Sequence, residues 1–156
     1  MNNLLFGGTA FIMFSLFVFA TINADSNAGS PKSFTAKWLS ENYDYLAPDG
    51  SEIRLLVEGA KGGLCHCPLP PGKVAKAHHH KSVEELWYCI AGEGEVWRRQ
   101  DERDETVPVR AGASLSIPPG TSFQFRNTGP EPLCFLLTTM PPWPGPQEAL
   151  PTQGKW

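Results

Sequence analysis

The sequence predicts an all-β domain, built as a sandwich or as a closed barrel. Short apolar segments recur along the chain, few stretches have helical character, and glycine and proline separate the segments. The chain has 156 residues with 15 glycines and 15 prolines, spread along its length rather than clustered. Turns at this frequency are typical of short strands, and a hydrophobic content of 41% is sufficient for a buried core.

The expected strands follow one another between residues 53 and 140. Each is a short apolar or alternating segment, and turn residues such as Gly59 and Gly112 lie between most of them. The expected strands are Ile53–Glu58, Gly63–Leu69, Ala77–His80, Glu85–Ala91, Glu95–Arg99, Thr106–Val109, Ser114–Ile117, Thr121–Arg126 and Leu133–Met140. The charged run Arg98–Glu105 is expected to form a solvated hairpin tip.

The segment before the barrel begins with an uncharged apolar run from Leu4 to Ala20. This run predicts a signal peptide over residues 1–24, with small residues at Ala20 and Ala24 as cleavage sites. The protein is therefore expected to be secreted or periplasmic. An uncleaved membrane anchor is the alternative, because the run is only slightly shorter than the ~20 residues of a spanning helix.

The remaining segments flank the barrel, which is assigned to residues 51–140. Residues 25–50 are expected to be a linker and an N-terminal arm, in which Trp38–Tyr45 forms a helical turn or covers the barrel. Residues 141–156 form a proline-rich tail that is expected not to continue the sheet. Its Trp143 and Trp156 are expected to pack back on the barrel.

Charge and cysteine content limit the possible partners. A net charge of −3 and a pI near 5.8 argue against nucleic acid as a partner. The even number of cysteines permits disulfides in an exported protein, but a chain of this size does not require them. Cys89 and Cys134 are expected to be buried thiols, and the Cys65-His66-Cys67 segment is a weak metal motif because it lacks the spacing of a zinc knuckle.

The most informative segment runs from Gly72 to Gly92 and contains His78, His80 and Glu85. Side chains alternate between the faces of a strand, so His78 and His80 point the same way. Two imidazoles and one carboxylate on one face are a ligand set for a divalent transition metal. The alternative is a hydrophilic loop with a chance run of histidines.

These residues resemble the two conserved motifs of the cupin family. Gly72, His78, His80, Glu85 and Gly92 match every position of the first motif, and Gly112, Pro118, Gly120 and Asn127 match the second motif. The second motif differs at its histidine position, which holds Phe123 here. The motifs are separated by residues 93–111, a normal gap for a small single-domain cupin, and the resemblance covers roughly residues 53–140.

The resemblance implies a double-stranded β-helix, or jelly-roll barrel, with a metal bound inside by His78, His80, Glu85 and a fourth ligand. Phe123 has no lone pair for a metal, so the fourth ligand is missing. His66, on the preceding strand, is the candidate for that place or for a supporting contact. Alternation places Trp87 and Cys89 on the face of Glu85, and Phe125 on the face of Phe123, so these residues are expected to line the pocket.

The sequence therefore predicts an exported cupin that binds one divalent metal and acts on a small molecule. Fe(II) is the first expectation, with Mn, Ni, Cu and Zn not distinguished, and an oxygenase is the first activity because three ligands leave positions open. The alternatives are a non-catalytic binding module for a sugar or other small ligand, and a metal-free isomerase or dehydratase. A homodimer is expected from the resemblance, and contact with a membrane only through an uncleaved N-terminal segment.

Overall fold

The computed structural model describes residues 34–156, so the predicted signal peptide and the residues up to position 33 lie outside the described part. Within residues 34–156, the regular structure consists of eleven strands and one short 3₁₀ helix. The elements are β1 (Tyr45–Leu46), β2 (Glu52–Gly59), β3 (Gly62–Leu69), β4 (His78–His80), β5 (Glu84–Ala91), β6 (Glu93–Gln100), β7 (Arg103–Arg110), β8 (Ser114–Ile117), β9 (Ser122–Asn127), β10 (Leu133–Met140), η1 (Pro146–Glu148) and β11 (Ala149–Pro151).

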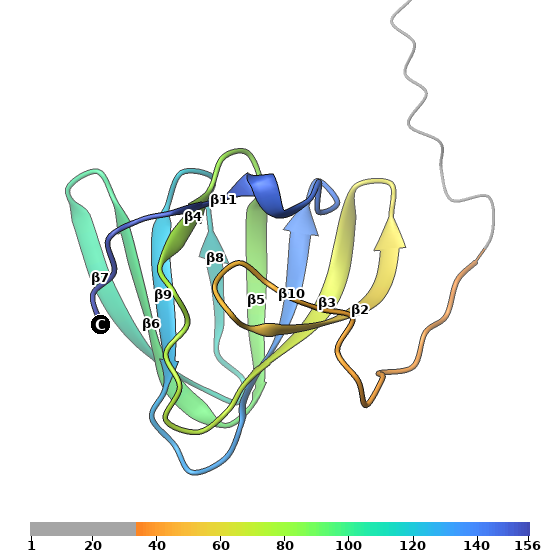
Figure 1. Ribbon diagram of the computed structural model, residues 1–156, viewed down its shortest axis with the longest axis horizontal. Helices are drawn as coiled ribbons and strands as arrows, with labels where there is room; N and C mark the ends of the chain where they lie inside the picture. The colour runs from red at the N-terminus through yellow and green to blue at the C-terminus, as the bar shows by residue number, and fades with distance from the viewer. Residues whose placement is uncertain (1–33) are drawn as a thin grey trace, which may run out of the picture.

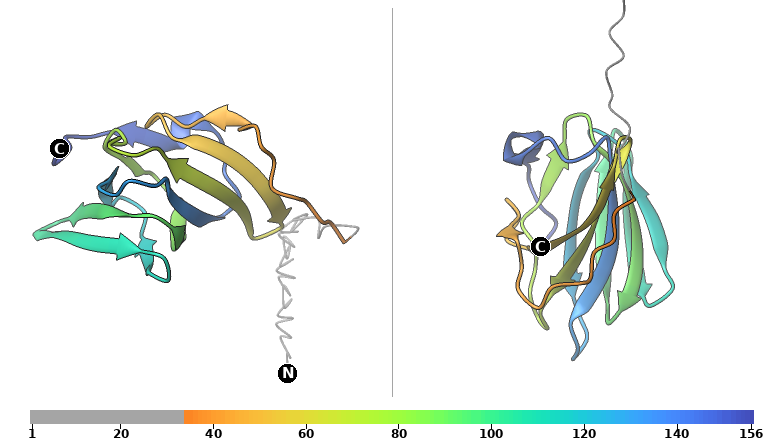
Figure 2. Two further views of the ribbon diagram at one scale, coloured as in Figure 1. Left: turned by 90° about the horizontal axis from the view of Figure 1, so that it is seen from below. Right: turned by 90° about the vertical axis from the view of Figure 1, so that its right-hand side faces the viewer.

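Two antiparallel sheets form the barrel. The larger sheet has the order β1-β2-β3-β10-β5-β8, and the smaller has the order β11-β4-β9-β6-β7. In Figure 1, β2 and β3 lie at one side of the molecule and the β6–β7 hairpin lies at the other. Figure 2 shows the two sheets facing each other. All nine expected strands are present within a few residues of their predicted bounds, which confirms the all-β prediction.

The alternation of apolar residues decides which side chains enter the core. Along β5, Glu85, Trp87 and Cys89 point inward, whereas Leu86 and Tyr88 point outward. Strand β10 lies between β3 and β5 in the larger sheet, and its inward residues complete this side of the core. The buried cluster consists mainly of Ile53, Cys65, Cys67, Leu69, Trp87, Cys89, Val96, Val109, Ile117, Phe123, Phe125, Leu133, Phe135 and Leu137.

Two motif residues have structural roles at the ends of strands. Gly92 has a φ of 74°, and a Cβ there would overlap the carbonyl oxygen of Pro132. Any side chain at this position is therefore excluded by both backbone conformation and space. Asn127 donates hydrogen bonds from Nδ2 to the carbonyl oxygens of Leu69 (2.9 Å) and Glu131 (2.8 Å), which joins the end of β9 to β3.

The C-terminal tail differs from the sequence prediction. It was expected not to continue a sheet, but Ala149–Pro151 form β11, which pairs with β4 at the edge of the smaller sheet. The prolines permit this because an edge strand needs hydrogen bonds on one side only. Beyond β11 the tail crosses the smaller sheet toward β7 (Figure 1), and Lys155 Nζ donates a hydrogen bond to Thr106 Oγ1 (2.7 Å).

The N-terminal arm contains no helical turn among its described residues. Its residues Tyr45 and Leu46 pair with the start of β2 as β1, and the loop that follows covers one end of the barrel. The charged run Arg98–Glu105 spans the turn between β6 and β7, in agreement with the predicted hairpin tip. In residues 34–156, no helix has the length and apolar character that crossing a membrane requires.

Candidate functional site

A cavity of about 260 Å³ lies between the two sheets and contains the side chains of the histidine motif. Strand β4 supplies His78 and His80, β5 supplies Glu85 and Trp87, and β9 supplies Phe123. Residues of the N-terminal arm and of the C-terminal tail also line this space. The predicted pairing of His78 and His80 on one face is thus present, while His79 lies on the other face and is partly exposed.

His78 and His80 are both buried, and their ring centroids lie 5.1 Å apart. Nδ1 of His78 lies 3.1 Å from the carbonyl oxygen of Lys76. With the proton on Nδ1, His78 donates to this oxygen and its Nε2 keeps a lone pair for a ligand. Nδ1 of His80 is buried without a hydrogen-bond partner among the described residues. An unpaired buried nitrogen is costly, so this atom is a candidate contact for a bound group.

Glu85 is buried beside the two rings. Its Oε2 accepts a hydrogen bond from Trp87 Nε1 (2.8 Å), and its Oε1 lies 3.9 Å from Nδ1 of His80. Burial raises the pKa of Glu85 to about 7, with a smaller contribution from the charge of Asp49, although the hydrogen bond from Trp87 acts in the opposite direction. Burial, followed by the proximity of His78, lowers the pKa of His80 to about 4. Both pKa shifts favour the neutral forms of Glu85 and His80. A charged pair is therefore disfavoured, although the two groups lie close together.

Phe123 occupies the position next to both histidines. Its ring centroid lies 4.2 Å from that of His78 and 5.3 Å from that of His80. The ring also meets Trp87 edge-on at 5.5 Å, and Phe125 meets Trp87 in the same way at 5.2 Å. Phe123 thus forms an apolar wall where the family motif has its fourth ligand, and Gln124 points away to bond the carbonyl oxygen of Ala75 (2.9 Å).

Two of the predicted site residues lie outside the cavity. His66 is on the opposite face of β3, beside Arg54 of β2, and the cavity is lined instead by Cys65 and Cys67. Burial lowers the pKa of His66, and the charge of Arg54 lowers it further. Cys89 points into the core but does not reach the cavity, and its thiol donates to the carbonyl oxygen of Ala91 (3.4 Å). His66 is therefore not placed to act as the fourth ligand.

The cysteines of the structure are all free thiols, as expected for Cys89. Burial raises the pKa of Cys65 to about 12, with an added effect of the charge of Glu85. Burial likewise raises the pKa of Cys67. Both thiols in the cavity are thus neutral at pH 7 and act as small apolar groups. Cys134, which was expected to be buried, is partly exposed on the outer face of β10.

Sequence reasoning did not identify the site residues that come from the ends of the barrel. Asp49 lies in the Pro48-Asp49-Gly50 turn, where its type is expected for local reasons alone. It is buried in the cavity, and its Oδ1 accepts hydrogen bonds from the backbone nitrogen (2.8 Å) and hydroxyl (2.6 Å) of Ser51. Trp143 packs back as predicted, but it does so against His80, with ring centroids 5.1 Å apart. Neither residue carries a local signal for this position.

The donor types in the cavity suit a divalent metal, whereas their arrangement is not that of a formed site. Among residues 34–156, no three His, Cys, Asp or Glu side chains are grouped closely enough to hold a metal ion. The unpaired Nδ1 of His80, the free Nε2 of His78 and the buried carboxylate of Glu85 are nevertheless the donors that such an ion requires. Two imidazoles and a carboxylate therefore fit a metal by type, and their side chains must rotate to converge on it.

Comparisons with known proteins identify the family. The Cupin domain family matches residues 65–139. An uncharacterised protein of Methanocaldococcus jannaschii is 32% identical over 70% of this chain and 91% of its own length. A protein of Streptomyces cyaneus named polyketide synthase CurC is 33% identical over 61% of this chain and 64% of its own length.

Solved structures agree with this assignment at the level of the fold. A conserved Klebsiella pneumoniae protein with a double-stranded β-helix domain has a TM-score of 0.55 and 20% identity, over 80% of this chain and 99% of its own. The region that the Cupin domain family matches, residues 65–139, includes His78, His80, Glu85 and Phe123. Membership of one family accounts for the barrel, for its two-sheet order and for the motif spacing. The chain belongs to the cupin family.

Proposed function

We propose that this cupin binds one divalent metal through His78, His80 and Glu85 and acts on a small molecule in the same cavity. The observation that supports the proposal most is the buried Nδ1 of His80, which has no hydrogen-bond partner among the described residues and lies 3.9 Å from the carboxylate of Glu85. A bound cation would satisfy this nitrogen and compensate the buried carboxylate. Fe(II) is the first candidate, and Mn, Ni, Cu and Zn have the same ligand types.

The residues around the ligand set have separable roles in this proposal. A redox-active divalent metal such as Fe(II), when bound, would supply open positions for a substrate and for dioxygen and the electrons that an oxygenase requires. The hydrogen bond from Trp87 fixes the orientation of the Glu85 carboxylate, and the carbonyl oxygen of Lys76 selects the tautomer of His78. Phe123 and Trp143 exclude water from the faces of the histidine rings.

Metal analysis of the purified protein tests this proposal. Wild type and a His78→Ala, His80→Ala double variant are loaded with each candidate metal, desalted and analysed by mass spectrometry for bound metal. The proposal expects about one ion per wild-type chain and a loss of most of it in the double variant. Equal metal content in both proteins would contradict the metal site. Oxygen uptake by the loaded wild type then separates an oxygenase from a protein that only binds its ligand.

A second function is a metal-free binding or isomerase site, and a specific observation favours it. No three metal-binding side chains are grouped in residues 34–156, and Phe123 occupies the fourth ligand position. In this alternative, His80 and Glu85 exchange protons with a bound small molecule. The name of the Streptomyces cyaneus relative supports a small-molecule role, without deciding between the two functions. Full activity after removal of metal by a chelator would favour this second function.

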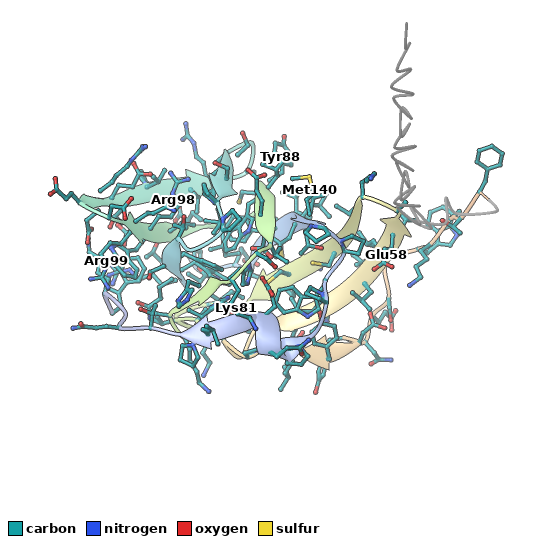
Figure 3. The ribbon with its side chains drawn as sticks, turned by 90° about the horizontal axis from the view of Figure 1, so that it is seen from above. Glu58, Lys81, Tyr88, Arg98, Arg99 and Met140 are labelled. Atoms are coloured by element: carbon teal, nitrogen blue, oxygen red, sulfur yellow. The ribbon has the colours of Figure 1, made fainter. Side chains whose placement is uncertain are left out.

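We also propose that the protein is exported and that it forms a homodimer. The apolar run at residues 4–20 supports export. The outer face of β5 supports the dimer, because Leu86, Tyr88 and Ile90 remain exposed there and form an apolar row. Figure 3 labels Tyr88 of β5 and Met140 of the neighbouring strand β10, both on the outer side of the larger sheet. Sedimentation analysis is expected to give a dimer for wild type and a monomer for Tyr88→Glu, and a monomeric wild type would contradict the dimer.

A further inference from the structure

The cavity is larger than the metal-ligand set requires. Its volume of about 260 Å³ compares with the roughly 150 Å³ of a cavity that holds a benzene molecule. A ligand of about two fused rings therefore fits this space. A small dicarboxylate or a single water would leave much of the apolar wall without contacts, which is unfavourable in a protein interior.

Aromatic rings form much of the cavity wall. Phe123 and Phe125 each meet Trp87 edge-on, and Trp143 lies against the ring of His80 from the tail. Apolar side chains of the larger sheet and the arm complete the wall, among them Ala47, Ile53 and Leu137. Edge-on and tilted rings around a void favour a planar aromatic ligand, because aromatic pairs gain energy beyond their buried area.

The charged groups of the cavity are nearly all acidic. Asp49 and Glu85 are its buried charged residues, and Glu58 lies exposed at its edge. The lining contains a single cationic residue, Lys37, which is exposed on the N-terminal arm. A buried anion without a cation is strongly unfavourable, so the protein itself selects against anionic ligands.

The polar atoms of the cavity instead suit a neutral hydrogen-bond donor. Nδ1 of His80 is buried without a partner among the described residues, and the Glu85 carboxylate lies beside it. A hydroxyl group that donates to Nδ1 of His80 would pair this atom, while Glu85 keeps its hydrogen bond from Trp87. Much of the remaining lining is aromatic or aliphatic.

We propose that the ligand of this cavity is a neutral, planar molecule of about two fused rings whose hydroxyl group points at His80 and Glu85. This inference rests on the proposed function because the ligand occupies the same site. It adds the class of ligand that the metal-free cavity accepts, because a bound metal would occupy the same atoms of His80 and Glu85. Small carboxylic acids and phosphorylated sugars are excluded from the metal-free cavity by its charge.

Binding of three probes to the chelator-treated full chain tests the inference. Isothermal titration calorimetry at pH 7 compares 2-naphthol, which is neutral, with 2-naphthoate, which has the same rings and a carboxylate, and with oxalate. We expect 2-naphthol to bind at least about tenfold more tightly than 2-naphthoate, and oxalate not to bind at about 1 mM. Equal or tighter binding of either anion, or no binding of 2-naphthol, would overturn the inference.

Variants locate the bound probe. Trp143→Ala removes one aromatic wall and is expected to weaken 2-naphthol binding by about fivefold or more, since a stacked ring contributes about 1 kcal/mol. Trp156→Ala, in the same tail but outside the cavity lining, is the matched control and should bind as wild type does. Equal affinity of Trp143→Ala and wild type would place the probe elsewhere and refute the assignment. Metal content is measured separately, so a failure of metal binding is distinguishable from a failure of this inference.

Discussion

The ring of Phe123 lies 4.2 Å from that of His78 and 5.3 Å from that of His80, and this residue has two effects on the site. It removes a nitrogen donor from the position where the family motif has histidine. It also places an apolar surface against both remaining imidazoles. A single side chain thus reduces the metal affinity expected for the cavity and increases its affinity for apolar ligands.

Replacement of Phe123 by histidine is expected to strengthen metal binding. The change adds an imidazole next to His78 and His80, and supporting contacts alone are worth roughly 10–100-fold in metal affinity. We expect the dissociation constant to fall by at least about tenfold in competition with a chromogenic chelator. Phe123→Leu is the matched control, because it changes the side chain without adding a donor. A gain of the same size in Phe123→Leu would contradict this explanation.

Glu85 is expected to make the stability of the metal-free protein depend on pH. Its pKa is raised from 4.5 to about 7 in the folded protein, so the folded state binds more protons than the unfolded state between these values. The stabilising effect of its protonated form is therefore present below pH 4.5 and is lost as the pH rises through about 7. The full loss amounts to about 3 kcal/mol, since each unit corresponds to about 1.4 kcal/mol.

Urea unfolding of wild type and Glu85→Gln at pH 5 and pH 8, with a chelator present, measures this effect. Glutamine does not titrate, so the free energy of unfolding of Glu85→Gln minus that of wild type should increase by about 2–3 kcal/mol from pH 5 to pH 8. Titration of His80, whose pKa is lowered to about 4, is present in both proteins and largely cancels. A difference that does not change with pH would show that Glu85 titrates normally.

At the scale of the elements, the C-terminal tail holds the histidine strand in place. Strand β11 pairs Ala149 with His80 and Pro151 with His78, so β4 is bonded to β9 on one side and to the tail on the other. Glu148, just before β11, anchors the tail because its Oε1 accepts hydrogen bonds from the backbone nitrogen of Val83 (2.9 Å) and the hydroxyl of Ser82 (3.0 Å). The tail thereby positions both ends of the loop between β4 and β5.

Loss of the Glu148 carboxylate is expected to weaken this anchor. Burial acts to raise the pKa of Glu148, but hydrogen bonds from the backbone of Ser82 and Val83 lower it below its ordinary value, so the residue is ionised at pH 7. Glu148→Ala leaves these donors without an acceptor and should reduce the free energy of unfolding by about 2 kcal/mol. Urea unfolding gives this value. The exposed neighbour Gln147→Ala is the control, with a change below about 0.5 kcal/mol. A change of that small size in Glu148→Ala would contradict the anchoring role.

At the scale of the whole molecule, the barrel closes around one cavity whose wall comes from distant parts of the chain. The N-terminal arm contributes Tyr45 and Asp49, the central strands contribute the histidine motif, and the tail contributes Trp143. Assembly of the cavity therefore requires the complete barrel with both of its flanking segments. The proposed ligand class depends on this assembly, because β4 and β5 supply the acceptors and Trp87, whereas β9 and the tail supply the other aromatic rings.

The N-terminal segment is a further feature of the whole chain, and its processing is a prediction. The apolar run at residues 4–20 and the small residues at positions 20 and 24 lead us to expect cleavage within the first 24 residues. Intact mass of the protein recovered from an exporting host should correspond to a chain that begins near residue 21 or 25. A mass that retains residues 1–24 would contradict cleavage and favour a membrane anchor.

The sequence by itself determined the fold and the inward-facing residues of the central strands. The positions of turn residues and the alternation along β5 depend on local geometry, so the facing of Glu85, Trp87 and Cys89 followed from a period of two. The same reasoning identified His78 and His80 as a pair, whereas the resemblance to the second cupin motif identified Phe123 as the missing ligand position. Periodicity left the facing of β3 open, because His66 and its neighbours Cys65 and Cys67 are each plausible inward residues.

Only the tertiary structure decided which side chains from outside the motif share the cavity. It placed Cys65 and Cys67 inside and His66 outside, brought Asp49 in from the arm, and paired the tail with β4 so that Trp143 lies against His80. These contacts join residues that are far apart in the chain, and they depend on how the arm and the tail close the barrel. Local sequence patterns contain no information on such closure, because they report which face a residue occupies and not what lies opposite to it.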